Sequence, residues 1–483
     1  MEIGVRRRRV QWVWIAALVL SCLAAAPAAA KQGGGKGSGP QPTQAGRLDP
    51  SFGKGGKALV AFPAAPNSDV GVKYDLPFQF TAGELKMVAS PGGRTVVAGS
   101  TRVARLLANG KPDRRFGNGG VTAIPDLPGR TFVLAAAAVD SQGRVLVAGS
   151  TRPLPTESTP DPLLSSAAVM RFSADGSLDT SFGGQGVLIT DFGVKAPEIG
   201  SGRYLGAAIG LRSIVVDSQD RPLLTGGFVA KITYCAGPNV AVSTAFVARL
   251  TETGSQDPSF GDNGLRQVAD FASFGQGSLL SGGLIAVGTA KPKCEGGGPP
   301  VVLTGFNAGG SLNPGFGFAG FRTVGFQNAP AMAIAPSGKI LLLGAKSKET
   351  QLIMRLLPNG TADPGFGRTG QVTVQPPAHA AFAALTADKR GRLLLAGRIT
   401  KRIKRSGLTR SSFLLGRLNP KGSVDRSFGH RGAVATGFGG PSSAFATQVA
   451  LDPKGRIMVG GGVSTPRLNT GGGFALARYL GER

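Results

Sequence analysis

Short runs of hydrophobic residues alternate with polar ones along most of this chain, and each run ends at Gly, Asp or Asn. Val103–Leu106 and Val145–Ala148 are typical runs. Short apolar runs that are rich in Val, Ile, Leu and Ala and bounded by turn residues are typical of β-strands. The pattern therefore predicts an all-β protein made of many short strands.

One turn motif, G-x-x-[DN]-x-x-F-G-x-x-G, occurs seven times, at intervals of about 63 residues. In its first copy Gly46 permits a positive φ, Asp49 accepts backbone N–H bonds, and Phe52 fills the turn from inside. Seven copies with Phe-Gly in register indicate a structural repeat. The predicted structural positions are Asp49, Phe52, Asp113, Phe116, Asp179, Phe182, Asp257, Phe260, Phe316, Asp363, Phe366, Asp425 and Phe428.

A second pattern recurs between the motif copies. Alternating apolar residues lead into a D-x-x-G-[RK] turn and a second apolar run, as in Asp140–Gly149 and Asp452–Gly460. This is a β-hairpin of strands A and B; strand C then leads into the motif and strand D follows it. Four short antiparallel strands in each of seven repeats predict a seven-bladed β-propeller. A parallel β-helix would need much shorter coils.

The two ends of the repeat region complement each other. The last unit stops at a third strand, Phe474–Leu480, while the first unit begins with the motif and a fourth strand, Lys57–Ala61. We expect these two strands to pair and complete the last blade, because pairing leaves no open sheet edge.

Charged residues also repeat. In five units an Arg lies eight residues before the motif Asp, and in a sixth both charges are absent together, with Gly305 and Asn313 in their places. This joint loss predicts a structural ion pair, and ring closure would supply Asp49 to Arg478. A carboxylate series that binds cations is the alternative. The predicted pairs are Arg105/Asp113, Arg171/Asp179, Arg249/Asp257, Arg355/Asp363 and Arg417/Asp425.

The L-D-x-S-F-G motif, as in Leu178–Gly183, and the D-x-x-G-R-hydrophobic-G segment resemble the delta-60 repeat family of mostly secreted bacterial proteins. The resemblance covers essentially residues 46 to 480. It implies export and a propeller-like fold, and it implies no activity. The unit that ends in the fifth motif departs most, because its hairpin turn is not recognisable.

Composition adds two constraints. The 483 residues include 76 Gly, and 54 Lys+Arg against 27 Asp+Glu give a net charge of +27. A hydrophobic fraction of 41% excludes a disordered basic tail, and the absence of a Gly-X-Y period excludes collagen. Most of the glycine excess is explained by turns repeated around a ring.

The N-terminal segment is typical of an exported protein. Four arginines precede the apolar run Val10–Ala26, and Ala28–Ala30 offers a small-residue cleavage site. We expect residues 1–30 to be a signal peptide, residues 31–45 a flexible Gly/Ser/Pro linker, and residues 46–483 the propeller, with a net charge of +24 after cleavage. A retained membrane anchor and a lipid on Cys22 are the alternatives.

Alternating strand direction places the A–B and C–D turns on one face, which we call the turn face. The B–C and D–A loops lie on the other, the loop face, and they vary freely in length and sequence. Scaffolds carry function on such variable loops, although drift without a function gives the same pattern. Cys235 and Cys294 fall in adjacent B–C loops; in an exported protein they predict a disulfide, with two free thiols as the alternative.

One B–C loop is strongly basic. Its residues are candidates for contact with a polyanion such as a cell-wall polymer, an acidic polysaccharide or lipid head groups. A solvated charged loop is the plain alternative, and nucleic acid is disfavoured because no aromatic residues lie between the charges. The candidate residues are Lys401, Arg402, Lys404, Arg405 and Arg410.

The sequence offers little for catalysis. It contains no G-x-S-x-G, Walker A, H-E-x-x-H or EF-hand motif, and no C-x-x-C or histidine spacing for zinc, so no cofactor or metal is predicted. We expect a secreted or cell-surface binding or scaffold module for a cell-wall, polysaccharide or protein partner. The alternatives are a structural surface protein and a carbohydrate-active enzyme. Four loop-face acids could serve the enzyme: Glu157, Asp161, Asp191 and Glu198.

Overall fold

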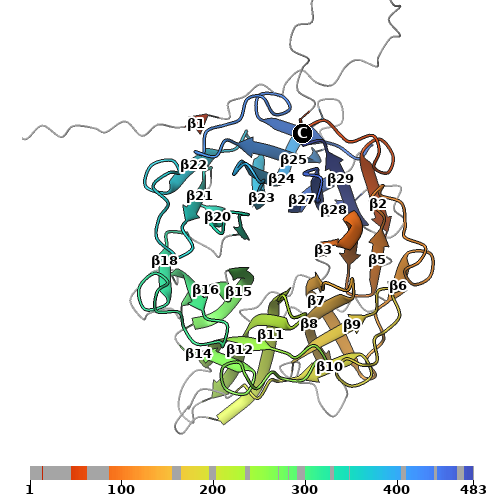
Figure 1. The fold of residues 1–483 in the computed structure, drawn as a ribbon, viewed down its shortest axis with the longest axis vertical. Helices are drawn as coiled ribbons and strands as arrows, with labels where there is room; N and C mark the ends of the chain where they lie inside the picture. The colour runs from red at the N-terminus through yellow and green to blue at the C-terminus, as the bar shows by residue number, and fades with distance from the viewer. Residues whose placement is uncertain are drawn as a thin grey trace, which may run out of the picture.

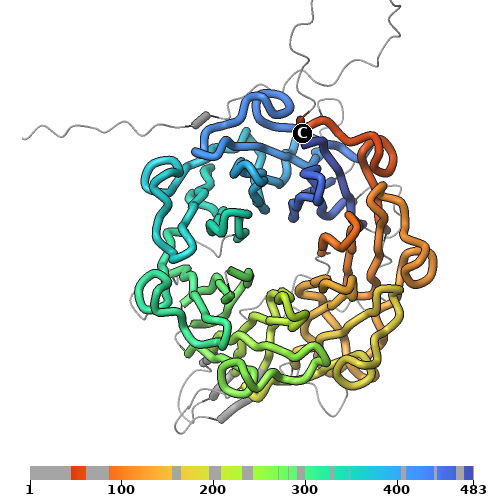
Figure 2. The backbone as a smooth tube through the Cα atoms, in the orientation of Figure 1, coloured from red at the N-terminus to blue at the C-terminus, as the bar shows by residue number. Residues whose placement is uncertain are grey.

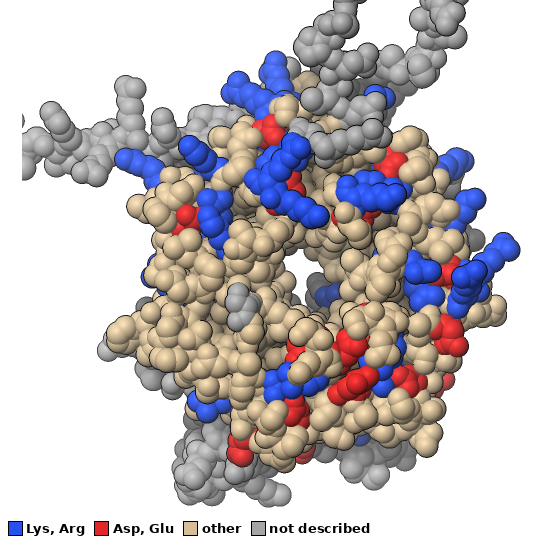
Figure 3. All heavy atoms as spheres, viewed as in Figure 1, with Lys and Arg blue, Asp and Glu red and all other residues tan. Residues whose placement is uncertain are grey.

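A computed structural model describes residues 13–14, 45–61, 86–154, 165–194, 203–233, 240–269, 271–280, 282–290, 300–326, 331–347, 349–403, 409–439, 443–464 and 473–481. Within these ranges the chain forms strands and one short 3₁₀ turn, Pro91–Gly93. None of the described segments is a helix long and apolar enough to cross a membrane. The strands form seven sheets around a central opening (Figure 1; Figure 3).

Each sheet contains one blade of four antiparallel strands, with strand A nearest the centre and strand D at the outer edge (Figure 1). Blades 1 to 3 contain β3 (Lys86–Ser90), β4 (Arg94–Ala98), β5 (Arg102–Leu106), β6 (Val121–Ala123); β7 (Arg130–Val139), β8 (Val145–Pro153), β9 (Ser166–Phe172), β10 (Val187–Thr190); and β11 (Arg203–Val216), β12 (Pro222–Thr233), β13 (Val240–Arg249), β14 (Leu265–Val268).

Blades 4 to 6 follow the same order. They contain β15 (Phe271–Leu280), β16 (Gly283–Ala290), β17 (Val301–Phe306), β18 (Phe321–Val324); β19 (Ala331–Ile334), β20 (Ile340–Ala345), β21 (Gln351–Leu356), β22 (Gln371–Gln375); and β23 (Ala380–Ala387), β24 (Leu393–Arg402), β25 (Thr409–Leu418), β26 (Ala433–Thr436). A two-residue strand, β1 (Val13–Trp14), also runs parallel to β22.

Blade 7 joins the two ends of the chain. It contains β27 (Ser443–Leu451), β28 (Ile457–Ser464) and β29 (Gly473–Tyr479), and its fourth strand is β2 (Lys57–Ala61) from the N-terminal side. The register runs from Lys57 opposite Ala477 to Ala61 opposite Gly473. The predicted seven-bladed propeller and its closure are both confirmed.

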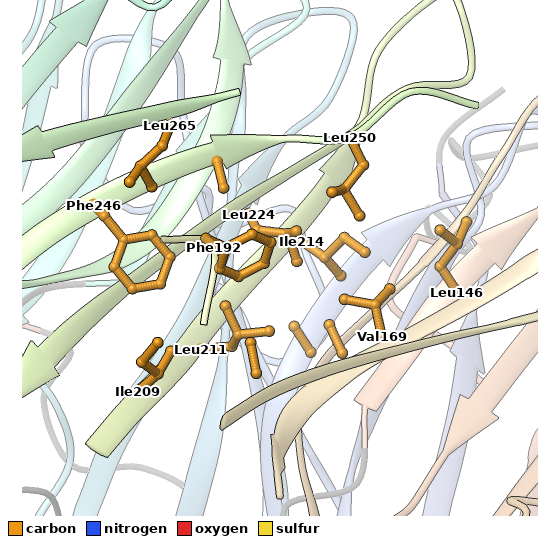
Figure 4. Close-up of a cluster of buried hydrophobic side chains, with 14 of the residues drawn as sticks. Leu146, Val169, Phe192, Ile209, Leu211, Ile214, Leu224, Phe246, Leu250 and Leu265 are labelled. Carbon is orange, nitrogen blue, oxygen red and sulfur yellow. The ribbon is translucent and has the colours of Figure 1, made fainter. Parts of the chain in front are cut away.

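The hydrophobic core is divided among the interfaces between blades. Each of seven clusters of buried side chains draws on two neighbouring blades. Between blades 2 and 3, for example, Leu146 and Val169 face Ile214 and Leu224 (Figure 4). Because a single blade cannot bury both of its faces, the stability of the fold depends on a complete ring.

The A–B turns follow the predicted chemistry. In blade 2, Oδ1 of Asp140 accepts hydrogen bonds from the backbone N–H groups of Gln142 and Arg144, at 3.0 and 2.9 Å. Gly143 adopts φ +79°, which favours glycine. The hairpin of blade 4, unrecognisable in sequence, is present as a tight link between paired Leu280 and Gly283.

Candidate binding surfaces

The seven motif turns lie around the outer perimeter, where Figure 2 shows them as tight curls of the backbone. The first copy shows the chemistry. Oδ1 of Asp49 accepts hydrogen bonds from the backbone N–H and the hydroxyl of Ser51, at 2.9 and 2.7 Å, and Oδ2 accepts one from Nε of Arg478 at 2.8 Å. The Arg478 guanidinium lies over the Phe52 ring, 4.7 Å from its centroid. Phe52 itself is fully buried.

The same ion pair forms in six of the seven blades, and all five pairs predicted by spacing, together with the pair predicted by closure, are confirmed. In each, the guanidinium also covers the motif Phe at 4.5 to 4.8 Å. The Nε–Oδ2 distances are 2.9 Å for Arg105–Asp113, 2.7 Å for Arg171–Asp179, 2.7 Å for Arg249–Asp257, 2.6 Å for Arg355–Asp363, 2.8 Å for Arg417–Asp425 and 2.8 Å for Arg478–Asp49.

Each motif turn also makes hydrogen bonds to the next blade. The sequence spacing alone did not indicate this contact. In blade 1, Nη1 of Arg105 donates to the carbonyl of Ala174, and the backbone N–H of Gly117 donates to Asp175 O at 2.6 Å. The Phe116 ring packs against Gly176, where a Cβ would lie 3.0 Å from the ring. The Gly amide bond recurs at all seven interfaces, from Gly53, Gly117, Gly183, Gly261, Gly317, Gly367 and Gly429.

A second inter-blade contact uses glutamine amides. The Gln276 side chain bonds both the carbonyl and the N–H of Met332, at 2.7 and 3.0 Å, and so joins blade 4 to blade 5. Gln351 does the same to Phe382 of blade 6, at 2.7 and 2.8 Å. Residues from different repeats make these bonds, so no local motif signals them.

The electrostatics of the motif carboxylates follow from these contacts. Burial of Asp179 opposes its ionisation, but hydrogen bonds from Ser181 and the charge of Arg171 outweigh burial, so the pKa of Asp179 lies below its usual value. The pKa values of Asp49, Asp113, Asp257, Asp363 and Asp425 are lowered by the same balance. These carboxylates are ionised structural anchors, as the ion-pair interpretation predicted.

Contacts between the two kinds of turn confirm that both lie on one face. Arg456 of the A–B turn of blade 7 reaches Asp49 at 3.5 Å, and Arg94 reaches Asp113 at 3.1 Å. In blade 2 the corresponding Arg144 instead contacts Asp220 of blade 3 at 3.6 Å and Glu252 at 2.9 Å. The turn face therefore carries most of the described acidic residues in paired form.

The predicted basic loop lies between β24 and β25 on the loop face. Lys401 and Arg410 are directly opposite each other in the register, with Arg402 opposite Thr409. Lys401 and Arg402 are exposed and Arg410 is half-buried, whereas Lys404 and Arg405 lie outside the described residues. This end of the hairpin therefore places two positive side chains opposite each other.

Ring closure adds a cation that the sequence did not place there. Nζ of Lys57, in the closing strand, donates to Gly437 O at 2.9 Å and lies 5.9 Å from the centroid of the Phe438 ring. Nη2 of Arg410 packs against the same Gly437, 2.7 Å from the position of an added Cβ. Burial, and then the nearby Arg410 charge, lower the pKa of Lys57. Nε of Arg410 is buried without a hydrogen-bond partner.

The remaining predicted residues do not form a site in the described structure. Cys22, Cys235 and Cys294 lie outside the described residues, as do Glu157, Asp161 and Glu198. Asp191 is described, and its Oδ1 accepts a hydrogen bond from Gly193 N at 2.9 Å within its own turn. His379, in a D–A loop, and His430, in a C–D turn, are both exposed and lie on opposite faces. Within the described ranges, no cluster of His, Cys, Asp or Glu could hold a metal ion.

A hollow on the turn face lies between blades 7 and 1. Met87, Ala89, Ala450 and Met458 line it with apolar atoms, and Arg94 stands at its edge. Arg94 is already paired with Asp113, so its guanidinium is not a free group for catalysis in this hollow.

Comparison with known proteins supports the architecture. The model of a domain of unknown function (DUF5122) beta-propeller matches residues 165–182 and 335–366, both of which end in a motif Phe. This places the chain with propeller repeat proteins. No curated protein matches the chain.

Solved structures similar to this chain are propellers or enzymes of distant sequence. The PQQ-bound aldose sugar dehydrogenase of Streptomyces coelicolor is 13% identical, with 83% of this chain and 97% of that chain covered and a TM-score of 0.35. The β-propeller domain of the Trilobed protease of Pyrococcus furiosus is 8% identical, with 83% and 96% covered and a TM-score of 0.39. The endo-arabinase of Bacteroides thetaiotaomicron is 12% identical, with 56% and 93% covered and a TM-score of 0.26. These similarities are too distant to assign an activity.

Proposed function

We propose that this protein is an exported, rigid binding module whose loop face holds an acidic partner, such as a cell-wall polymer, polysaccharide or acidic protein segment. The observation that carries the proposal is the meeting of Lys57 and Arg410 at Gly437, beside exposed Lys401 and Arg402. Export is part of the proposal and agrees with the signal-like N-terminus and with the resemblance to delta-60 repeat proteins.

The half-buried position of this cluster favours an anion. Burial, and then the nearby Arg410 charge, lower the pKa of Lys57, so the charged form of Lys57 is disfavoured at this position. A carboxylate or sulfate beside Lys57 and Arg410 would offset the repulsion between the two cations. The T-shaped pair Phe413–Phe438, with centroids 4.8 Å apart, provides a rigid floor beside the two cations.

The carboxylates of the repeats support binding rather than catalysis. All six motif aspartates hold an arginine, so they are not available as a general acid or base. A ring whose blades are joined by hydrogen bonds is rigid, so it is well suited to presenting a binding surface of fixed shape.

Polygalacturonate, a linear polymer of uronic acids, is a suitable probe, with a neutral glucan of similar length as the reference ligand. We expect binding of the acidic polymer alone, weakening as salt concentration rises. The substitutions Lys401→Glu, Arg402→Glu and Arg410→Gln together should abolish it. The matched control reverses the charge of three exposed turn-face lysines, Lys54, Lys421 and Lys454. This variant should bind polygalacturonate as the wild-type protein does.

Two results would overturn the proposal. The first is equal affinity of the loop-face variant and the wild-type protein. The second is release of shortened products or new reducing ends during incubation, which would identify a carbohydrate-active enzyme instead of a binding module.

A further inference from the structure

The turn face carries its own concentration of positive charge, separate from the predicted loop. Over three consecutive blades, 6, 7 and 1, the A–B turns and motif turns expose lysines and arginines both near the centre and at the rim. We call this surface the basic arc. Its exposed residues are Lys389, Arg390, Lys421, Arg426, Arg431, Lys454, Arg47, Lys54, Lys111, Arg114 and Arg115.

Among the described residues, the carboxylates within the basic arc are already engaged by arginines. Each described carboxylate on the turn face of these three blades is buried or half-buried and already holds an arginine of its own blade. The pairs are Asp388–Arg392, Asp425–Arg417, Asp452–Arg456, Asp49–Arg478 and Asp113–Arg105. Among the described residues of these three blades, the turn face therefore exposes lysines and arginines and no carboxylate.

The same face is different over blades 2 and 3. Its described turns expose Asp175, Glu252 and Asp262, and they expose no lysine or arginine. Figure 3 shows the contrast, with blue atoms spread over the top and right of the molecule and red atoms gathered at the lower right. The excess charge is thus concentrated on one side of one face and is not spread evenly around the ring.

The N-terminal segment enters the fold at the same place. Ala45 O accepts a hydrogen bond from Gly429 N at 3.2 Å, and Gly46 N donates to Leu480 O at 2.9 Å. Arg47 and Arg431 flank this point. The chain before Ala45, which includes Cys22, therefore leads into the propeller within the basic arc, while β1 (Val13–Trp14) of the same segment pairs with β22 of blade 5.

We propose that the basic arc docks on a membrane surface rich in anionic phospholipid, with the loop face turned away from the lipid. Lysines and arginines near such a surface each strengthen binding by about fivefold. A single lipid chain or weak apolar anchor holds a protein only marginally, whereas a chain combined with a polybasic patch holds it stably. An apolar or lipidated N-terminus that enters within the arc would place the membrane anchor and the polybasic patch on the same side of the ring.

This docking deepens the proposed function without sharing its residues. The loop face would then present Lys401, Arg402 and Arg410 to a partner away from the membrane. Because the two surfaces use different side chains on opposite faces, one proposal can fail while the other holds.

Co-sedimentation of the full chain with two sets of vesicles tests the docking, one of phosphatidylcholine and one of phosphatidylcholine mixed with phosphatidylglycerol. We expect stronger binding to the anionic vesicles, and we expect this preference to disappear at high salt. The variant Lys54→Gln, Lys421→Gln and Lys454→Gln should lower the preference about hundredfold. The corresponding Lys→Glu variant should lower it further.

The matched control replaces three exposed residues of β24 outside the arc, Arg398→Gln, Lys401→Gln and Arg402→Gln, and should keep the full preference for anionic vesicles. Thermal melting of both variants checks that the ring is intact. Equal binding to neutral and anionic vesicles would overturn the proposal, because the apolar N-terminus would then account for all of it. Loss of the preference in the control variant alone would also overturn it, as would binding to polygalacturonate through the arc without binding to anionic vesicles.

Discussion

The motif turn of blade 4 and the motif turns of the other six blades have the same shape but different chemistry. In blade 4 Asn313 replaces the aspartate, yet its Oδ1 still accepts the backbone N–H of Gly315 at 3.0 Å, and Phe316 is still fully buried. Gly317 N still bonds Asn359 O of the next blade at 2.8 Å. Gly305 replaces the arginine, and a Cβ there would lie 2.6 Å from the Phe316 ring.

This comparison separates what makes the turn from what reinforces it. A short polar side chain, positive-φ glycines and a buried Phe are enough for the turn and for its amide bond to the next blade. The Arg–Asp pair adds a cation over the ring and a second bond across the interface, as in blade 2, where Nη1 of Arg171 bonds Glu252 O. Six blades therefore have a reinforced interface and one has the plain form.

The largest effect is expected where the reinforced turn also joins the two ends of the chain. Deletion of residues 46–62 removes β2, Phe52 and the partner of Arg478, so blade 7 loses its outer strand and the ring opens. We expect a loss of more than about 5 kcal/mol of unfolding free energy and a loss of cooperative melting. Deletion of residues 31–44 is the control, and its melting temperature should match that of the full chain. An unchanged melting temperature after the first deletion would contradict closure by β2.

Truncation of the motif aspartate in a reinforced turn should lower the free energy of unfolding much more than truncation of the corresponding Asn in blade 4. Asp179→Ala leaves the buried Arg171 charge without its carboxylate, at a cost of about 3 kcal/mol. Asn313→Ala removes only a turn hydrogen bond and should cost about 1 kcal/mol. Urea unfolding of both variants gives the difference directly, and equal costs would mean that the ion pair adds nothing to the turn.

A double-mutant cycle isolates the pair itself. Arg171→Ala combined with Asp179→Ala should destabilise the protein by less than the sum of the two single changes, because the second substitution removes a charge that was already unpaired. Additive costs would show that the two side chains act independently despite their 2.7 Å contact.

Acid should weaken the six reinforced turns and spare the plain one. Their aspartates have pKa values below the usual range, so the ion pairs stabilise the folded state above about pH 4. That stabilisation is lost as pH falls through the lowered pKa values. Amide exchange measured by mass spectrometry, corrected for intrinsic rates, should show faster opening at low pH for turns such as Asp363–Gly370 than for Asn313–Gly320. Parallel acceleration of both turns would contradict this account.

The smallest effect is expected when the plain turn is converted. Gly305→Arg alone forces a side chain toward the Phe316 ring and should destabilise the protein. Addition of Asn313→Asp supplies the missing carboxylate and should bring stability back to within about 1 kcal/mol of the wild type. Thermal melting of the single and double variants measures this recovery. A double variant no more stable than Gly305→Arg alone would show that blade 4 cannot accept the pair.

Much of the fold could be predicted because its signals are local. Strands B and C are short apolar runs bounded by turn residues, the motif fixes a turn within eleven residues, and Arg171 and Asp179 lie eight residues apart on one hairpin. The fourth strand at Lys57–Ala61 and its missing blade could be counted from the repeats. The candidate site was predicted only in part: Lys401, Arg402 and Arg410 stand out in sequence, but Lys57 does not.

The sequence by itself determined the strands, the turns, the number of blades and the ion pair within each reinforced turn, since each depends on residues of a single repeat. Only the tertiary structure decided which residues of different repeats meet: Arg105 with Ala174, Gln351 with Phe382, Lys57 with Arg410, and the basic turns of blades 6, 7 and 1 as one surface. The physical reason is that these contacts depend on how twisted blades pack when the ring closes, and no spacing within one repeat encodes that geometry.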